Sequence, residues 1–148
     1  MDPETGKIII DGVEFRPGYT FEDFKKTPFY TNQDGIRIIP LKGGKEIDAH
    51  KFIASLFFRD GKLYMISLAC VDMDIPFEKD EKRTLLHRQI LAEYGLSDAN
   101  TFPWETLKVI YDPRSNSSTI VFCINRIVVS SITNICLKWL SVIAGRWR

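Results

Sequence analysis

The histidines and cysteines carry the most versatile chemistry in this chain, because imidazoles and thiolates act as bases, nucleophiles and metal ligands. The chain has two histidines, His50 and His87, and three cysteines, Cys70, Cys123 and Cys136. None falls in an HxH, HxxxH, HExxH or CxxC pattern, so no metal site is expected. The cysteines lie in apolar runs, which favours small buried residues over nucleophiles. We predict no catalytic residue, no cofactor and no enzymatic activity.

An alternative stays open, in which the protein is a small hydrolase or nuclease of unrecognised type. Such an enzyme would use His50 or His87 as a base together with scattered acids, because catalysis needs a converging set of side chains.

A short acidic stretch is the candidate partner-binding site. Its acids are Asp72, Asp74, Glu78, Asp80 and Glu81. The stretch is not an EF-hand calcium loop, because an arginine stands where the closing glutamate would be. We interpret it as a solvated loop that could contact a basic partner. The alternative is that these acids only keep the surface soluble.

The charge is divided unevenly along the chain. All 19 acids but only 15 of the 20 bases precede residue 113, so this body carries a net −4 and residues 113–148 carry +5. The total of +1 gives no support to nucleic-acid binding, which usually needs a clear basic excess. An acidic body favours a basic protein partner, since complementary charges speed association.

Turn signals and hydrophobic alternation predict the elements that position these residues. Strands are expected as a hairpin over Gly6–Phe15, a single strand at Ile36–Leu41, a hairpin of Lys51–Phe58 with Lys62–Val71, and a hairpin of Thr106–Tyr111 with Ser118–Ile124. Helices are expected over 21–26 and 80–94, and loops over Asp72–Asp80 and Ser97–Pro103. The prediction is an α+β fold: an antiparallel sheet of about six to seven strands with one long helix on a face.

The C-terminal part differs from this body. Residues 1–125 are predicted to form one domain, and 126–148 a basic, apolar, helical segment, because apolar residues recur there at steps of three and four. Residues 127–143 could pack on the sheet, mediate self-association or anchor the chain to a membrane; a membrane role is disfavoured by the polar residues within the segment. Alternatively, the domain ends near Asn125 and the residues after it come from an altered or appended reading frame. The acidic N-terminus and unpaired cysteine pattern indicate a cytoplasmic protein.

Five segments give the chain a family resemblance. They are Ile8–Phe15, Pro17–Phe24, Phe58–Leu63, Glu93–Gly95 and Pro103–Ile120. Across residues 6–124 the chain resembles small bacterial immunity proteins encoded beside polymorphic or contact-dependent growth-inhibition toxins. Members often end just after the last strand, so 127–148 departs from the pattern. The resemblance implies that the protein binds a cognate toxin, which could be a nuclease, and blocks its active site in the cytoplasm.

Overall fold

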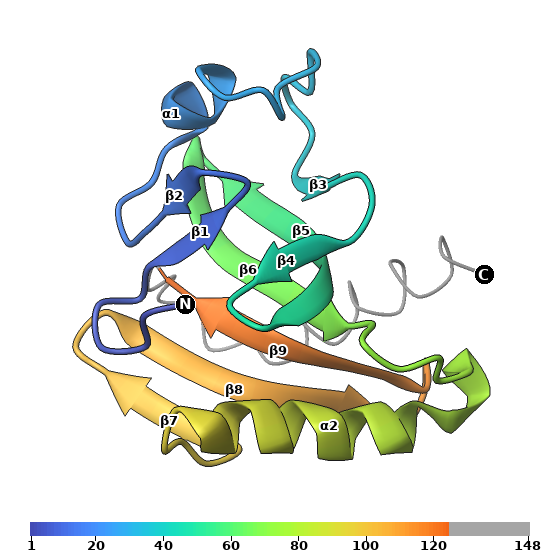
Figure 1. Cartoon of the computed structure of the whole chain (residues 1–148). Helices are drawn as coiled ribbons and strands as arrows, with labels where there is room; N and C mark the ends of the chain where they lie inside the picture. Colours follow the sequence, from blue (N-terminus) through green and yellow to red (C-terminus); the bar gives the residue numbers. More distant parts are fainter. Residues whose placement is uncertain (125–148) are drawn as a thin grey trace.

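The computed structural model describes residues 1–124, which form an α+β fold dominated by antiparallel strands (Figure 1). The main sheet contains β3 (Ile38–Pro40), β4 (Lys45–Ile47), β5 (His50–Arg59), β6 (Lys62–Cys70), β7 (Ala99–Phe102), β8 (Glu105–Asp112) and β9 (Ser117–Cys123). Its order is β3-β5-β6-β9-β8-β7, with β4 also paired to β5. A separate two-stranded hairpin contains β1 (Ile8–Ile10) and β2 (Val13–Phe15). The predicted fold class is confirmed.

Two α-helices and one 3₁₀ turn complete the described chain: α1 (Phe21–Lys25), the turn Phe77–Lys79 and α2 (Asp80–Glu93). A capping box starts α1, in which the Thr20 hydroxyl accepts from the Asp23 amide and the Asp23 carboxylate accepts from the Thr20 amide, both at 3.1 Å. The C-terminal end of α2 is closed by Gly95 at φ 73°. Both helices begin and end within one residue of their predicted bounds.

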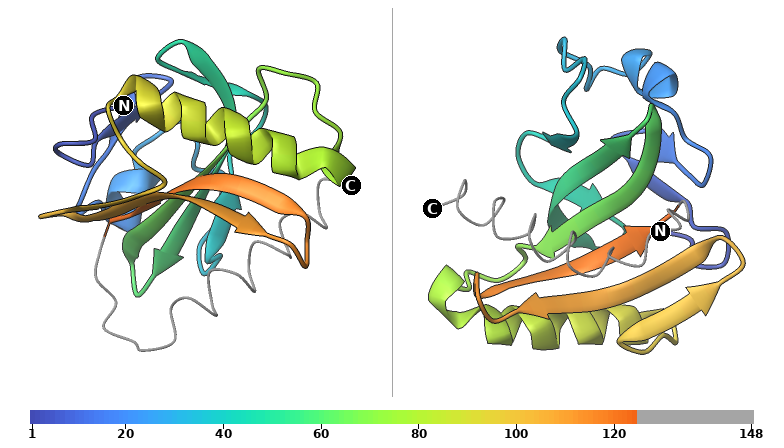
Figure 2. Two further views of the ribbon diagram at one scale, coloured as in Figure 1. Left: turned by 90° about the horizontal axis from the view of Figure 1, so that it is seen from below. Right: turned by 180° about the vertical axis from the view of Figure 1, so that it is seen from behind.

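Helix α2 covers one face of the sheet, where it packs against β9, β8 and β6 (Figures 1 and 2). Its buried side chains include His87, Ile90 and Leu91, and the facing strands contribute Leu107 and Ile120 to the same core. The hairpin β1–β2 and α1 cover another part of this core. The helix therefore fixes the position of the acidic stretch at its own N-terminal end.

Two strands are missed by the sequence prediction, and a third is shorter than expected. A loop is predicted over Ser97–Pro103, but Ala99–Phe102 pairs with β8 as an edge strand. Its side chains alternate between exposed and half-buried, so its hydrophobic pattern is weak. Strand β4 is missed because Lys45–Ile47 holds a single apolar residue. The predicted strand Ile36–Leu41 contracts to Ile38–Pro40. Residues 125–148 lie outside the described residues, so the C-terminal helix and the domain boundary stay predictions.

The N-terminal turn packs tightly against a tryptophan of the far hairpin. Trp104 stacks on Phe122 with ring centroids 5.8 Å apart, and its indole nitrogen donates to the Pro3 carbonyl at 2.8 Å. Gly6 lies over this ring at φ 72°, and a Cβ at this residue would be 2.6 Å from Trp104 Cδ2. Only a glycine fits at this position, because the backbone is left-handed and the space is filled.

Gly6→Ala is therefore expected to lower the free energy of unfolding by about 1–3 kcal/mol, through overpacking added to backbone strain. Gly12→Ala is the matched control, since Gly12 has φ 80° but no atom within 4 Å of the place that its Cβ would occupy. Urea denaturation measures the loss of stability in both variants. The loss in Gly12→Ala reports backbone strain alone, and the additional loss in Gly6→Ala reports the contact with Trp104. Equal losses of stability in the two variants would show that the contact with Trp104 does not matter.

Candidate functional site

The acidic stretch lies between the end of β6 and the first turn of α2 (Figure 1). Asp72, Asp74, Glu78 and Glu81 are exposed. Asp80, in contrast, is only 2% exposed. Asp80 therefore does not share the surface of the other four acids, because its side chain faces the protein interior. Nothing in the sequence indicates this, since the orientation of the helix that begins at Asp80 depends on the whole sheet.

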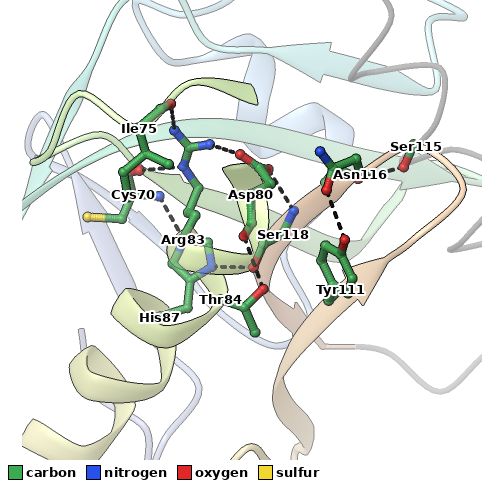
Figure 3. A network of polar contacts seen from close by, with 11 residues as sticks. Cys70, Ile75, Asp80, Arg83, Thr84, His87, Tyr111, Ser115, Asn116 and Ser118 are labelled. Atoms are coloured by element: carbon green, nitrogen blue, oxygen red, sulfur yellow. Dashed lines mark hydrogen bonds and ion pairs between the residues drawn. The ribbon is translucent and has the colours of Figure 1, made fainter. Parts of the chain in front are cut away.

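A buried ion pair holds the acidic stretch in place (Figure 3). The Asp80 carboxylate pairs with the Arg83 guanidinium, and both side chains are almost fully buried. The second carboxylate oxygen of Asp80 accepts from the Ser118 amide on β9 at 3.0 Å. Arg83 also donates from Nε to the Cys70 carbonyl at 3.0 Å and from Nη2 to the Ile75 carbonyl at 2.9 Å. One side chain thus joins the helix, the end of β6 and the loop between them.

His87 belongs to the same network and is fully buried. Its Nε2 accepts from the Cys70 amide at 2.9 Å, so Nδ1 carries the proton and donates to the Ser118 hydroxyl at 2.9 Å. Burial, reinforced by the Arg83 charge, lowers the pKa of His87 to about 3. The imidazole stays neutral with both nitrogens occupied, which is the arrangement of a structural histidine rather than a general base.

His50 lies at the start of β5 between two carboxylates. Its Nδ1 is 2.5 Å from Asp72 Oδ2, and its Nε2 is 2.8 Å from Glu93 Oε2. Burial by itself lowers the pKa of His50, but hydrogen bonds to Asp72 and Glu93 outweigh burial and raise that pKa above its usual value. Asp72 is therefore engaged within the protein, and its Oδ1 also accepts from the Lys51 amide at 2.6 Å.

Cys70 completes a group of potential metal ligands with His50 and Asp72. One ligand atom from each residue lies within 4.8 Å of the others. Cys70 is fully buried, and burial raises the pKa of its thiol to about 11. In Figure 3 its sulfur points away from Arg83 and His87. No spacing rule could predict this group, because its members come from β5, the end of β6 and the loop that follows.

The other three acids of the stretch point to solvent. Within residues 1–124, Asp74, Glu78 and Glu81 form no hydrogen bond or ion pair through their side chains. Two large exposed apolar side chains are close to these acids in the sequence: Met73 in the loop is 58% exposed and Leu85 on α2 is 57% exposed. Exposed apolar side chains with polar residues around them occur at protein interaction sites. We call Met73, Asp74, Glu78, Glu81 and Leu85 the acidic surface.

Comparison with known proteins identifies no relative: no family model, no curated protein and no solved structure matches the chain. None of the helices formed by residues 1–124 has the length and apolar character needed to cross a membrane. The segment 127–143, for which packing on the sheet, self-association and membrane anchoring are the alternatives, lies outside the described residues.

Proposed function

We propose that this protein is a non-enzymatic inhibitor that binds a cognate protein toxin in the cytoplasm, as an immunity protein does. The observation that carries the proposal is the acidic surface, where Asp74, Glu78 and Glu81 are unpaired within the described chain. Asp74 and Glu78 precede α2 in a segment that Arg83 anchors, and Glu81 lies in the first turn of α2. An anchored loop loses little conformational entropy when it binds, so its charges are available at low cost.

The chemistry of this surface indicates the kind of toxin that it fits. Nuclease active sites are basic because they bind phosphates, and three carboxylates complement such a site and steer its approach. Met73 and Leu85 add apolar area, which a stable interface needs in its centre. The resemblance to immunity proteins supports the same conclusion. A hydrolase is disfavoured on both histidines: His87 is buried and neutral, and both ring nitrogens of His50 are engaged with the carboxylates of Asp72 and Glu93.

The proposal is tested by co-expressing the chain with the product of the adjacent upstream gene. We expect that product to arrest growth alone, the chain to restore growth, and the two proteins to co-purify. A toxic neighbour that is neither neutralised nor bound would overturn the proposal, as would a neighbour that is not toxic.

The contribution of the acidic surface is tested with the triple variant Asp74→Asn, Glu78→Gln, Glu81→Gln. We expect its association rate with the toxin to fall about 10-fold or more at low salt, with a weaker salt dependence, because rim charges act mainly on association. The matched control neutralises three other exposed acids through Glu4→Gln, Glu46→Gln and Asp60→Asn. If the association rate falls by the same factor in both triple variants, net charge rather than this surface governs binding.

A further inference from the structure

We propose that His50, Cys70 and Asp72 bind a divalent cation of the zinc class, with Glu93 as the outer carboxylate that orients His50. This inference does not depend on the toxin-binding proposal. It concerns a second group of side chains, which lies beside the acidic surface and which the proposed binding does not use. Three properties support it: the distances within the group, the contacts that hold each ligand, and the ion that the three atoms together would select.

The distances suit a metal ion after small side-chain movements. The three ligand atoms lie within 4.8 Å of one another. Bonds of about 2.0–2.3 Å in a tetrahedral zinc site separate neighbouring ligand atoms by roughly 3.3–3.6 Å. Binding would therefore require Nδ1 of His50 and Oδ2 of Asp72 to open from 2.5 Å, and the longest separation to close by about 1.5 Å at most. Rotations of exposed Asp72 and half-buried His50 can supply both changes.

The backbone around the ligands is already fixed. The Cys70 amide donates to His87 Nε2, and the Cys70 carbonyl accepts from Arg83 Nε. Asp72 uses Oδ1 for the Lys51 amide at 2.6 Å, which leaves Oδ2 for the ion. A site whose ligands are held before binding loses less entropy when the ion enters. The network in Figure 3 thus holds the backbone of the ligand Cys70 as well as the segment that leads into α2.

Glu93 occupies the place of an outer-shell partner. Its Oε2 is 2.8 Å from Nε2 of His50, on the side of the ring opposite to Asp72. Metal-binding histidines nearly always donate their second ring N–H to a carboxylate, a carbonyl or water, which fixes the tautomer and the ring orientation. With Nε2 donating to Glu93, the Nδ1 lone pair is directed toward Asp72 and can bind the ion.

The ligand types select the ion. A thiolate, an imidazole and a carboxylate are the donors that zinc prefers, whereas magnesium and calcium take oxygen ligands. On binding, one proton leaves the hydrogen-bonded His50–Asp72 pair and another leaves the Cys70 thiol, and both pass to solvent. Three protein ligands leave a fourth position for water or for a group from another molecule. The ion would also link Asp72 to His50 on β5 and, through the contact of His50 with Glu93, to α2.

The test is a titration of the purified, chelator-treated full chain with Co²⁺, followed by Zn²⁺. We expect one equivalent of Co²⁺ to bind with a thiolate-to-cobalt charge-transfer band, and Zn²⁺ to displace it and abolish the band. Cys70→Ser and His50→Gln should abolish the band, while Cys123→Ser, a half-buried cysteine on β9, should keep it. Glu93→Gln should keep the band but weaken affinity about 10–100-fold.

A chain that shows no charge-transfer band, or a band that survives Cys70→Ser, would overturn the proposal. The second of these results would assign the thiolate to Cys123 or Cys136. Circular dichroism shows whether each variant folds. If Cys70→Ser does not fold, Asp72→Asn decides the matter, because Asp72 is exposed at the start of a loop. Unchanged Zn²⁺ affinity in Asp72→Asn would also contradict the site.

Discussion

Arg83→Met is expected to lower the free energy of unfolding by about 3–5 kcal/mol, the cost of leaving a buried charge without its partner. Asp80 is 2% exposed and would lose the guanidinium that balances its charge, while its second carboxylate oxygen still accepts from the Ser118 amide. The carbonyls of Cys70 and Ile75 would lose their donors at the same time. Methionine preserves most of the side-chain volume, so the loss reports on the polar contacts rather than on a cavity.

The control is Arg88→Met on the same helix. Arg88 pairs with Asp98 at 2.8 Å, but both side chains are about half exposed, so its removal should change stability by less than about 1 kcal/mol. Urea denaturation of both variants makes the comparison. A double variant, Asp80→Asn with Arg83→Met, should recover part of the loss because no unpaired charge remains. A loss in Arg83→Met as small as that in Arg88→Met would show that the buried pair is not essential.

Arg83→Met should also increase local opening of residues 71–79, the loop between β6 and α2. Arg83 is the side chain that ties the loop, through the Ile75 carbonyl, to the helix and to the end of β6. Arg83→Met should therefore speed amide exchange in residues 71–79 more than in α1, because local opening follows the loss of local contacts. This links the stability of the core to the arrangement of the surface that we propose for toxin binding.

Local signals account for the parts of the fold that the sequence predicted. The hairpin turns at Asp11-Gly12 and Asp60-Gly61 adopt positive φ at both residues, as a type I′ turn requires. The capping box at Thr20 also acts within one turn of helix. Such features depend on a few neighbouring residues, and each lies in or beside an element that the sequence predicts. Edge strand β7 has no comparable local signal, since its pairing with β8 supplies its order.

The geometry of the candidate site, like the pairing of β7, depends on contacts between distant residues, so the sequence indicates only part of it. The spacing of acids marked the loop, but whether an acid such as Asp80 faces inward depends on the partner that the fold brings to it. The group of His50, Cys70 and Asp72 likewise exists only because β5 and β6 pair, with Phe52 opposite Cys70. Glu93 joins it from the last turn of α2. Contacts between residues so far apart in the chain leave no spacing pattern.

Acidification is expected to destabilise the protein through His87. Its pKa is about 3 in the folded protein and about 6.5 in an unfolded chain. The unfolded state therefore binds a proton that the folded state excludes, so stability falls as pH drops below about 6.5 and continues to fall toward pH 3. At about pH 5 the expected cost is roughly 2 kcal/mol, since each pKa unit corresponds to about 1.4 kcal/mol.

His87→Gln isolates this effect, because glutamine can still accept from the Cys70 amide and donate to Ser118 but does not titrate. The variant should be less stable than the original chain at about pH 7.5, and the gap should narrow by roughly 2 kcal/mol at about pH 5. The raised pKa of His50 acts in the opposite direction, with stability lost as pH rises, but it is common to both proteins and cancels in the difference. Urea denaturation at the two pH values measures the gap. If the free energies of unfolding of the two proteins change with pH in parallel, the ring of His87 is protonated in the folded protein. Nε2 of His87 could then not accept from the Cys70 amide.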